Sequence, residues 1–68
     1  MDKEKIVIDF INENFVPESI VVTDFPLFPA GKKIIDSNGG EMVVFYDLLT
    51  NAVKWIYPDK KNNIGGKL

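Results

Sequence analysis

The chain has 68 residues and a formal net charge of −2, with ten acidic residues, eight lysines and no arginine, histidine or cysteine. The missing cysteine and histidine exclude disulfide bonds, thiolate or imidazole metal sites, and catalytic centres built on a thiol–imidazole or hydroxyl–imidazole pair. A chain of this length forms one small domain stabilised by apolar packing, to which the 46% of hydrophobic residues contribute.

No stretch looks like a targeting or membrane-spanning segment. The apolar residues after the charged start are interrupted by Asp9 and Asn12, and no run approaches the roughly 20 apolar residues that span a bilayer. We therefore expect a cytoplasmic protein with no membrane partner. The abundance of Lys, Asn and Ile is typical of an AT-rich genome, bacterial or phage, and says nothing about function.

Residues 3–15 are predicted to form a helix. At 100° per residue the apolar side chains fill one broad arc, and the polar side chains fall opposite it. Asp2 is placed to cap the helix, and Pro17 prevents its continuation. The alternative is a strand at residues 5–11, because the Ile-Val-Ile run is β-branched.

Residues 19–25 are rich in β-forming side chains and predict a strand. The following residues 25–31 hold two prolines and a glycine, which indicate a loop, yet this loop carries the large apolar side chains of Phe25, Leu27 and Phe28. Residues 32–36 and 41–46 predict two further strands. Asn38 and Gly39 between them supply the positive φ angles of a tight hairpin turn.

Residues 47–57 allow two interpretations. As a helix, the segment would begin at Asp47 and end before Pro58, with its leucines on one face. As a hairpin, Asp47 and Thr50 would bond the turn backbone, Asn51 would take the left-handed conformation, and residues 52–57 would form a strand. We favour the hairpin, because the β-branched and aromatic residues after Asn51 are better strand formers than helix formers.

These elements predict an α+β fold, in which an N-terminal helix packs on a small three- to four-stranded antiparallel meander sheet. Residues 1–58 form the single domain, and the polar residues 59–68, with a Gly65-Gly66 pair, are expected to be a disordered C-terminal tail.

Catalysis has little support in the sequence. Four aspartates, Asp24, Asp36, Asp47 and Asp59, lie near predicted strand ends or turns, where aspartate ordinarily bonds the turn backbone. No spacing resembles a calcium loop or a phosphate-binding loop. We therefore expect no enzymatic activity, no cofactor and no bound metal.

The sheet has more apolar residues than one helix can cover. Both faces of the strands at 41–46 and 52–57 carry apolar side chains, whereas an antiparallel sheet normally shows one polar face. Either the loop at 25–31 folds back as a lid over the second face, or that face is an interface. The candidate binding residues are those in the loop and the sheet aromatics, namely Phe25, Leu27, Phe28, Tyr46, Trp55 and Tyr57.

The leading hypothesis is a small non-enzymatic protein-binding module, a regulator or inhibitor of a larger protein, whose partner is another protein or a second copy in a homodimer. The alternative is a nucleic-acid-binding accessory protein that stacks bases on sheet aromatics among lysines. Nucleic acid is the weaker candidate partner, because the net charge is negative and acidic residues interleave with the lysines.

Overall fold

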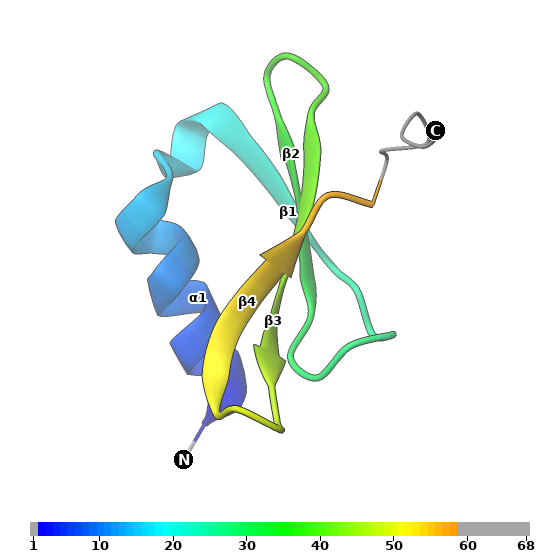
Figure 1. The fold of residues 1–68 in the computed structure, drawn as a ribbon. Helices are drawn as coiled ribbons and strands as arrows, with labels where there is room; N and C mark the ends of the chain where they lie inside the picture. The colour runs from blue at the N-terminus through cyan, green and yellow to red at the C-terminus, as the bar shows by residue number, and fades with distance from the viewer. Residues whose placement is uncertain (1, 59–68) are drawn as a thin grey trace.

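Four consecutive strands form one antiparallel sheet, and one helix lies across it, in a computed structural model that describes residues 2–58. The strands follow each other in the order β1-β2-β3-β4, which confirms the predicted helix-plus-meander fold. In Figure 1 the sheet is seen close to edge-on, with α1 on one side and the loop between β1 and β2 on the other. The elements are α1 (Lys3–Asn14), the 3-10 turn η1 (Pro17–Ser19), β1 (Ile20–Asp24), β2 (Lys32–Asp36), β3 (Glu41–Asp47) and β4 (Ala52–Ile56).

The helix α1 begins where its sequence predicts and ends one residue earlier than predicted, so the alternative of an N-terminal strand is wrong. Asp2 caps it, with a side-chain oxygen that accepts from the backbone N–H of Lys5 at 3.2 Å. Val7 and Ile11, one turn apart, are its buried residues. At the other end Phe15 is already extended, and its N–H donates back to the carbonyl of Ile11.

The main core lies between α1 and the sheet. Residues that pair across neighbouring strands point to the same face, so the register Lys32↔Val44↔Trp55 defines the helix-side face. The buried cluster on this face combines two helical and three strand residues, Val7, Ile11, Ile34, Val44 and Tyr46. The helix contacts β3 and β4, so it covers the half of the sheet that contains the last two strands.

The loop at residues 25–31 folds onto the second face of the sheet at Phe45 and acts as a lid over that part of the face, while Val21 and Ile56 on the same face stay exposed. The ring of Phe28 lies 4.7 Å from the ring of Phe45 on β3, and the ring of Phe25 lies 5.7 Å from that of Phe28. Val43, which shares this face with Phe45, is completely buried. Of the two possibilities left open by the sequence, the folded lid is therefore present.

Backbone bonds hold the lid in place. The N–H of Tyr46 donates to the carbonyl of Pro29 at 3.0 Å, which joins the lid to the end of β3. Ala30 has a positive φ of 51°, a conformation that L-residues adopt at some energetic cost. Gly31 must lack a side chain, because a Cβ there would collide with the carbonyl oxygen of Phe25.

The two hairpin turns differ in the residue that has a positive φ, which is Gly39 in one and Asn51 in the other. Between β2 and β3 only Gly39 has a positive φ, 84°, so the expectation of a positive φ at Asn38 is wrong. The Asp36 carboxylate instead accepts from the N–H groups of Asn38 and Gly40, each at 2.8 Å, and shapes the turn.

The segment after β3 is a hairpin, as favoured from the sequence, and the helical alternative is wrong. Asp47 accepts from the N–H of Leu49 at 2.9 Å, and Asn51 takes the left-handed conformation with φ 54°. Among residues 2–58, no helix is long and apolar enough to cross a membrane. The prediction of a disordered tail at residues 59–68 lies outside the described residues.

Candidate functional site

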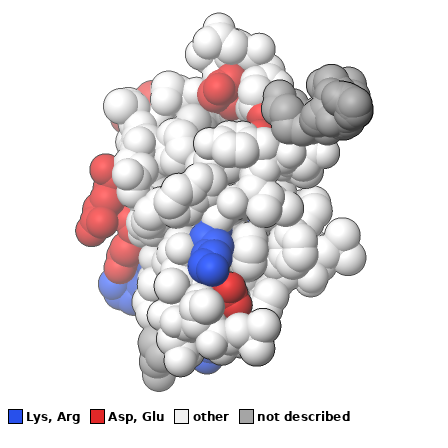
Figure 2. Space-filling view, in the orientation of Figure 1, with Lys and Arg blue, Asp and Glu red and all other residues white. Residues whose placement is uncertain are grey.

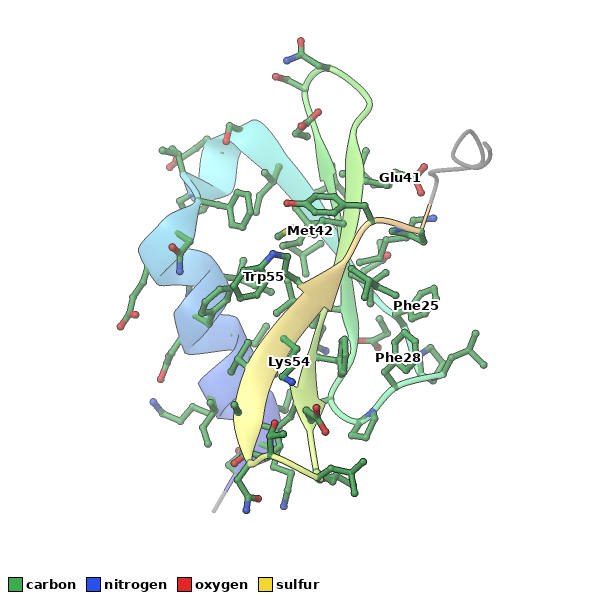
Figure 3. The ribbon with its side chains drawn as sticks, in the orientation of Figure 1. Phe25, Phe28, Glu41, Met42, Lys54 and Trp55 are labelled. Atoms are coloured by element: carbon green, nitrogen blue, oxygen red, sulfur yellow. The ribbon has the colours of Figure 1, made fainter. Side chains whose placement is uncertain are left out.

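The six predicted binding residues fall on different parts of the molecule. Phe25, Leu27 and Phe28 belong to the lid on the second face. Trp55 lies on the helix side of the sheet, and Tyr57 lines a hollow there together with Phe10 of α1. Figure 3 shows Phe25 and Phe28 on the side of the sheet away from α1, and Trp55 next to the helix. Tyr46 is only 4% exposed and belongs to the core. The six residues therefore do not form one surface, and their role in binding stays a prediction.

The end of β4 and the residue after it expose three consecutive large apolar side chains. Trp55 is 47% exposed, Ile56 40% and Tyr57 56%. Trp55 is held in place because its ring stacks on that of Phe10 in α1, with centroids 5.4 Å apart and planes inclined by 22°. One side of the indole is thus packed while a large part of it faces solvent, as is typical of an aromatic anchor in an interface.

Next to these aromatics the helix-side face is hollowed. Two hollows of about 310 and 300 Å³ share Phe15, Met42 and Tyr57 as lining residues. We call the continuous depression the Met42 groove. It lies where α1 ends, so the final turn of the helix leaves this part of the sheet uncovered. Its remaining lining residues are Phe10, Asn14, Ile34, Asp36, Gly40, Glu41 and Trp55.

The Met42 groove has an acidic end. Asp36 lines it, and by its register with Ile20 its side chain is on the helix-side face. Asp36 also lines a neighbouring hollow together with Glu18. Glu41 contributes to the groove wall, but its carboxylate bonds Lys33 at 2.9 Å, and Figure 3 shows the side chain pointing away from the helix.

The lysines of the described chain are largely engaged elsewhere. Lys5 bonds Asp9 at 2.8 Å, Lys33 bonds Glu41, and Lys54 lies 3.3 Å from Asp47. Lys3 lies over the ring of Tyr46, 5.8 Å from its centroid. Figure 2 shows a basic side chain in the lower middle of this face with an acidic one directly beside it. No cluster of uncompensated lysines therefore forms on residues 2–58.

Lys32 is an unexpected feature, since it is the one buried charged residue between residues 2 and 58, with 8% of its surface exposed. Its ammonium bonds Glu4 at 2.6 Å and Asp24 at 2.5 Å, and so joins the first turn of α1 to the end of β1. These hydrogen bonds, Asp24 first, raise the pKa of Lys32 above its ordinary value of 10.5. One feature of the sequence points to this burial, because Lys32 shares its strand face with Ile34.

The β4 strand also offers backbone groups at the edge of the sheet. The N–H of Tyr46 points toward the β2 side, where it bonds Pro29. The backbone N–H and C=O groups of successive residues in a strand point alternately to its two sides. Those of Phe45 therefore point toward β4 and face those of its partner Lys54. The peptide groups of Val53 and Trp55 consequently point outward from the edge, in the pattern to which an added strand pairs.

No three His, Cys, Asp or Glu side chains gather in a way that could hold a metal ion within the described part of the chain. No protein-family model, no curated protein and no solved structure matches the chain. The Met42 groove and the exposed rings of Trp55 and Tyr57 are therefore the features from which a function is inferred.

Proposed function

We propose that this chain is a small non-enzymatic protein-binding module, acting as a regulator or inhibitor of a larger protein. The observation that carries the proposal is the continuity of the exposed Trp55 and Tyr57 with the Met42 groove. Partly exposed aromatics beside an apolar depression are the features enriched in binding hot spots. The outward peptide groups of β4 add main-chain donors and acceptors to the same margin.

The packing beneath this surface supports the same proposal. Trp55 is fixed by its stacking on Phe10, and Met42 lies on a strand paired on both sides. A preorganised surface loses little conformational entropy when a partner binds. Binding therefore needs no large rearrangement of the elements that line the groove.

The nucleic-acid alternative has weaker support. Binding of a phosphate backbone relies on lysine or arginine side chains that replace condensed counterions. Lys5, Lys32, Lys33 and Lys54 already make ion pairs with carboxylates of the same chain. The Met42 groove has a carboxylate at its end, and no lysine among residues 2–58 lines it.

A capture experiment with two matched variants tests the proposal. The full-length protein is immobilised and exposed to a lysate of the organism that encodes it, with and without nuclease. Tyr57→Ser removes an aromatic ring that is 56% exposed and follows the end of β4, so the fold should persist. Leu49→Ser removes an even more exposed apolar side chain, 94%, from the β3–β4 turn.

We expect a discrete protein to be retained by the wild type and by Leu49→Ser, to be lost with Tyr57→Ser, and to survive nuclease. Thermal melts of both variants establish that they are folded. Equal capture by the wild type and both variants would show that the surface around β4 is not the binding site. Retention that disappears with nuclease would instead favour the nucleic-acid alternative.

A further inference from the structure

The Met42 groove has an asymmetric chemical character that indicates the kind of segment it can take. Its middle is formed by Phe15, Met42 and Tyr57, which suit one large apolar side chain. One end is formed by Asp36, which makes no ion pair within residues 2–58. An occupant that places an apolar side chain over Met42 therefore brings its neighbouring residues close to a carboxylate.

The end of α1 contributes negative potential to the same place. The carbonyl end of a helix dipole favours a nearby cation, and lysine or arginine usually supplies it within the last turn. The last turn of α1 contains no basic residue. Phe15, which follows directly, lines the groove. The negative helix terminus and Asp36 thus lie at one depression without a cation from the described chain.

A second carboxylate extends this negative region. Glu18 in η1 lines a neighbouring hollow together with Asp36, and it makes no ion pair with any lysine of the described residues. The lysines of residues 2–58 are engaged by other carboxylates or by the Tyr46 ring. Asp36 and Glu18 therefore place negative charge, which no lysine of the described residues pairs, at the end of the sheet where the groove opens.

We propose that the Met42 groove binds a peptide segment of a partner protein in which a large apolar residue is flanked by lysine or arginine. The apolar side chain packs over Met42 between Phe15 and Tyr57, and the basic side chain reaches Asp36 and the end of α1. This inference rests on the proposed function and deepens it by naming the chemistry of the partner segment.

Two synthetic peptides test directly whether the Met42 groove prefers a segment with basic residues. One has the sequence Thr-Val-Lys-Leu-Lys-Val-Thr, and the other replaces both lysines with glutamate. Each is titrated into the ¹⁵N-labelled full chain at low salt while backbone amide shifts are recorded. We expect the lysine peptide to shift the amides of Phe15, Met42 and Tyr57, with a dissociation constant at least about fivefold below that of the glutamate peptide.

Two charge variants distinguish the effect of the groove carboxylate from the effect of the net charge of the protein. Asp36→Asn removes the carboxylate but keeps an oxygen for the N–H groups of Asn38 and Gly40. It should weaken the lysine peptide about threefold, the size expected for one solvent-exposed ion pair. Asp9→Asn changes the net charge by the same amount on the helix surface, where Asp9 bonds Lys5, and should leave the affinity unchanged.

Each other outcome overturns the inference in a distinct way. Equal affinity for both peptides, or an equal loss in the two variants, would show that Asp36 does not select a basic segment. Lysine-dependent shifts confined to another face would place the site elsewhere. In each case, a protein captured from lysate in a Tyr57-dependent way would still support the proposed function. If no such protein is captured, the proposed function itself is wrong.

Two other possible occupants of the Met42 groove would each give a distinct experimental result. A dimer that dissociates on addition of the lysine peptide, seen by sedimentation, would assign the groove to a second copy of the chain. Residues 59–68 follow Tyr57 and Pro58 closely and contain Lys60 and Lys61. If the double variant Lys60→Gln, Lys61→Gln binds the lysine peptide more than about threefold more tightly, the groove is assigned to this segment and not to a partner.

Discussion

The ring of Phe28 in the lid lies 4.7 Å from the ring of Phe45 in β3, on the face of the sheet that α1 does not cover. This contact gives the small domain a second apolar layer. The same face includes Val43, which is fully buried although no helix covers it. The lid is therefore a structural part of the domain, even though its sequence has the composition of a loop.

Replacing Phe28 with alanine should lower the free energy of unfolding by about 2–3 kcal/mol, because the ring packs between Phe25 and Phe45 but is only partly buried. Leu27→Ala is the control in the same loop, since Leu27 is 80% exposed, and should change stability by less than about 0.5 kcal/mol. Urea unfolding followed by tryptophan fluorescence measures both. Equal small effects would mean that the lid is not part of the folded core.

Gly31→Ala should destabilise the domain by about 2 kcal/mol or more, because the added Cβ collides with the Phe25 carbonyl and the lid must shift. The comparison is Gly39→Asn in the β2–β3 turn. Gly39 has φ 84° with open space around it, and asparagine tolerates that region at a cost of about 1 kcal/mol. If the two variants melt at the same temperature, the close approach of the lid backbone is not rigid.

The Lys32 ion pairs predict a stability effect at alkaline pH. The pKa of Lys32 in the folded state lies above 10.5 because Asp24 and Glu4 bond its ammonium. Its contribution is therefore complete below pH 10.5 and is lost as the pH rises through the raised value. Lys32→Met keeps the apolar stem and removes the ammonium.

We expect Lys32→Met to be about 1 kcal/mol less stable than the wild type near pH 7, since both carboxylates are largely exposed and water screens them. The difference should shrink above about pH 11. Urea midpoints of both proteins across this range measure it. A difference that stays constant would mean that the packing of the stem, and not the charge, accounts for the effect.

The lowered pKa of Asp47 predicts that the stability of the domain falls at acidic pH. The N–H of Leu49 bonds its carboxylate and, with a smaller effect from Lys54, lowers the pKa of Asp47 below 3.8. The resulting stability is present above pH 3.8 and is lost as the pH falls through the lowered value. Asp47→Asn should therefore be less stable than the wild type at neutral pH and equally stable in strong acid.

The matched variant Lys54→Met removes the ion pair with Asp47 at 3.3 Å but leaves the Leu49 bond. It should retain most of the acid dependence, because the backbone bond is the larger cause. Urea midpoints measured from neutral to strongly acidic pH decide between the two causes. A flat profile in Lys54→Met would make the lysine the main one.

Local signals predicted most of the fold. The period of the apolar residues and the Asp2 cap were sufficient to place α1, and Asp47 with Asn51 identified the β3–β4 turn. These features act within a few residues, so a single sequence displays them. The same local nature explains why the strand order followed, since each strand pairs with the next one in the chain.

Features that depend on distant segments were not predictable in the same way. The lid could have been an interface, because only the packing of Phe28 on Phe45 distinguishes the two. Lys32 resembled an ordinary solvated lysine, since its partners Glu4 and Asp24 come from separate elements. The Met42 groove escaped prediction for a related reason, because α1, β3 and the segment after β4 all contribute to it.

The separation of α1 from its packing partners determines the order in which the domain can be completed. The helix comes first in the chain, yet it packs on β3 and β4, the last two strands. During synthesis the apolar side of α1 thus has no sheet to cover it until residues 41–56 have left the ribosome. The hairpins can close by neighbour pairing at each stage, whereas docking of the helix is a late event that joins the two ends of the domain.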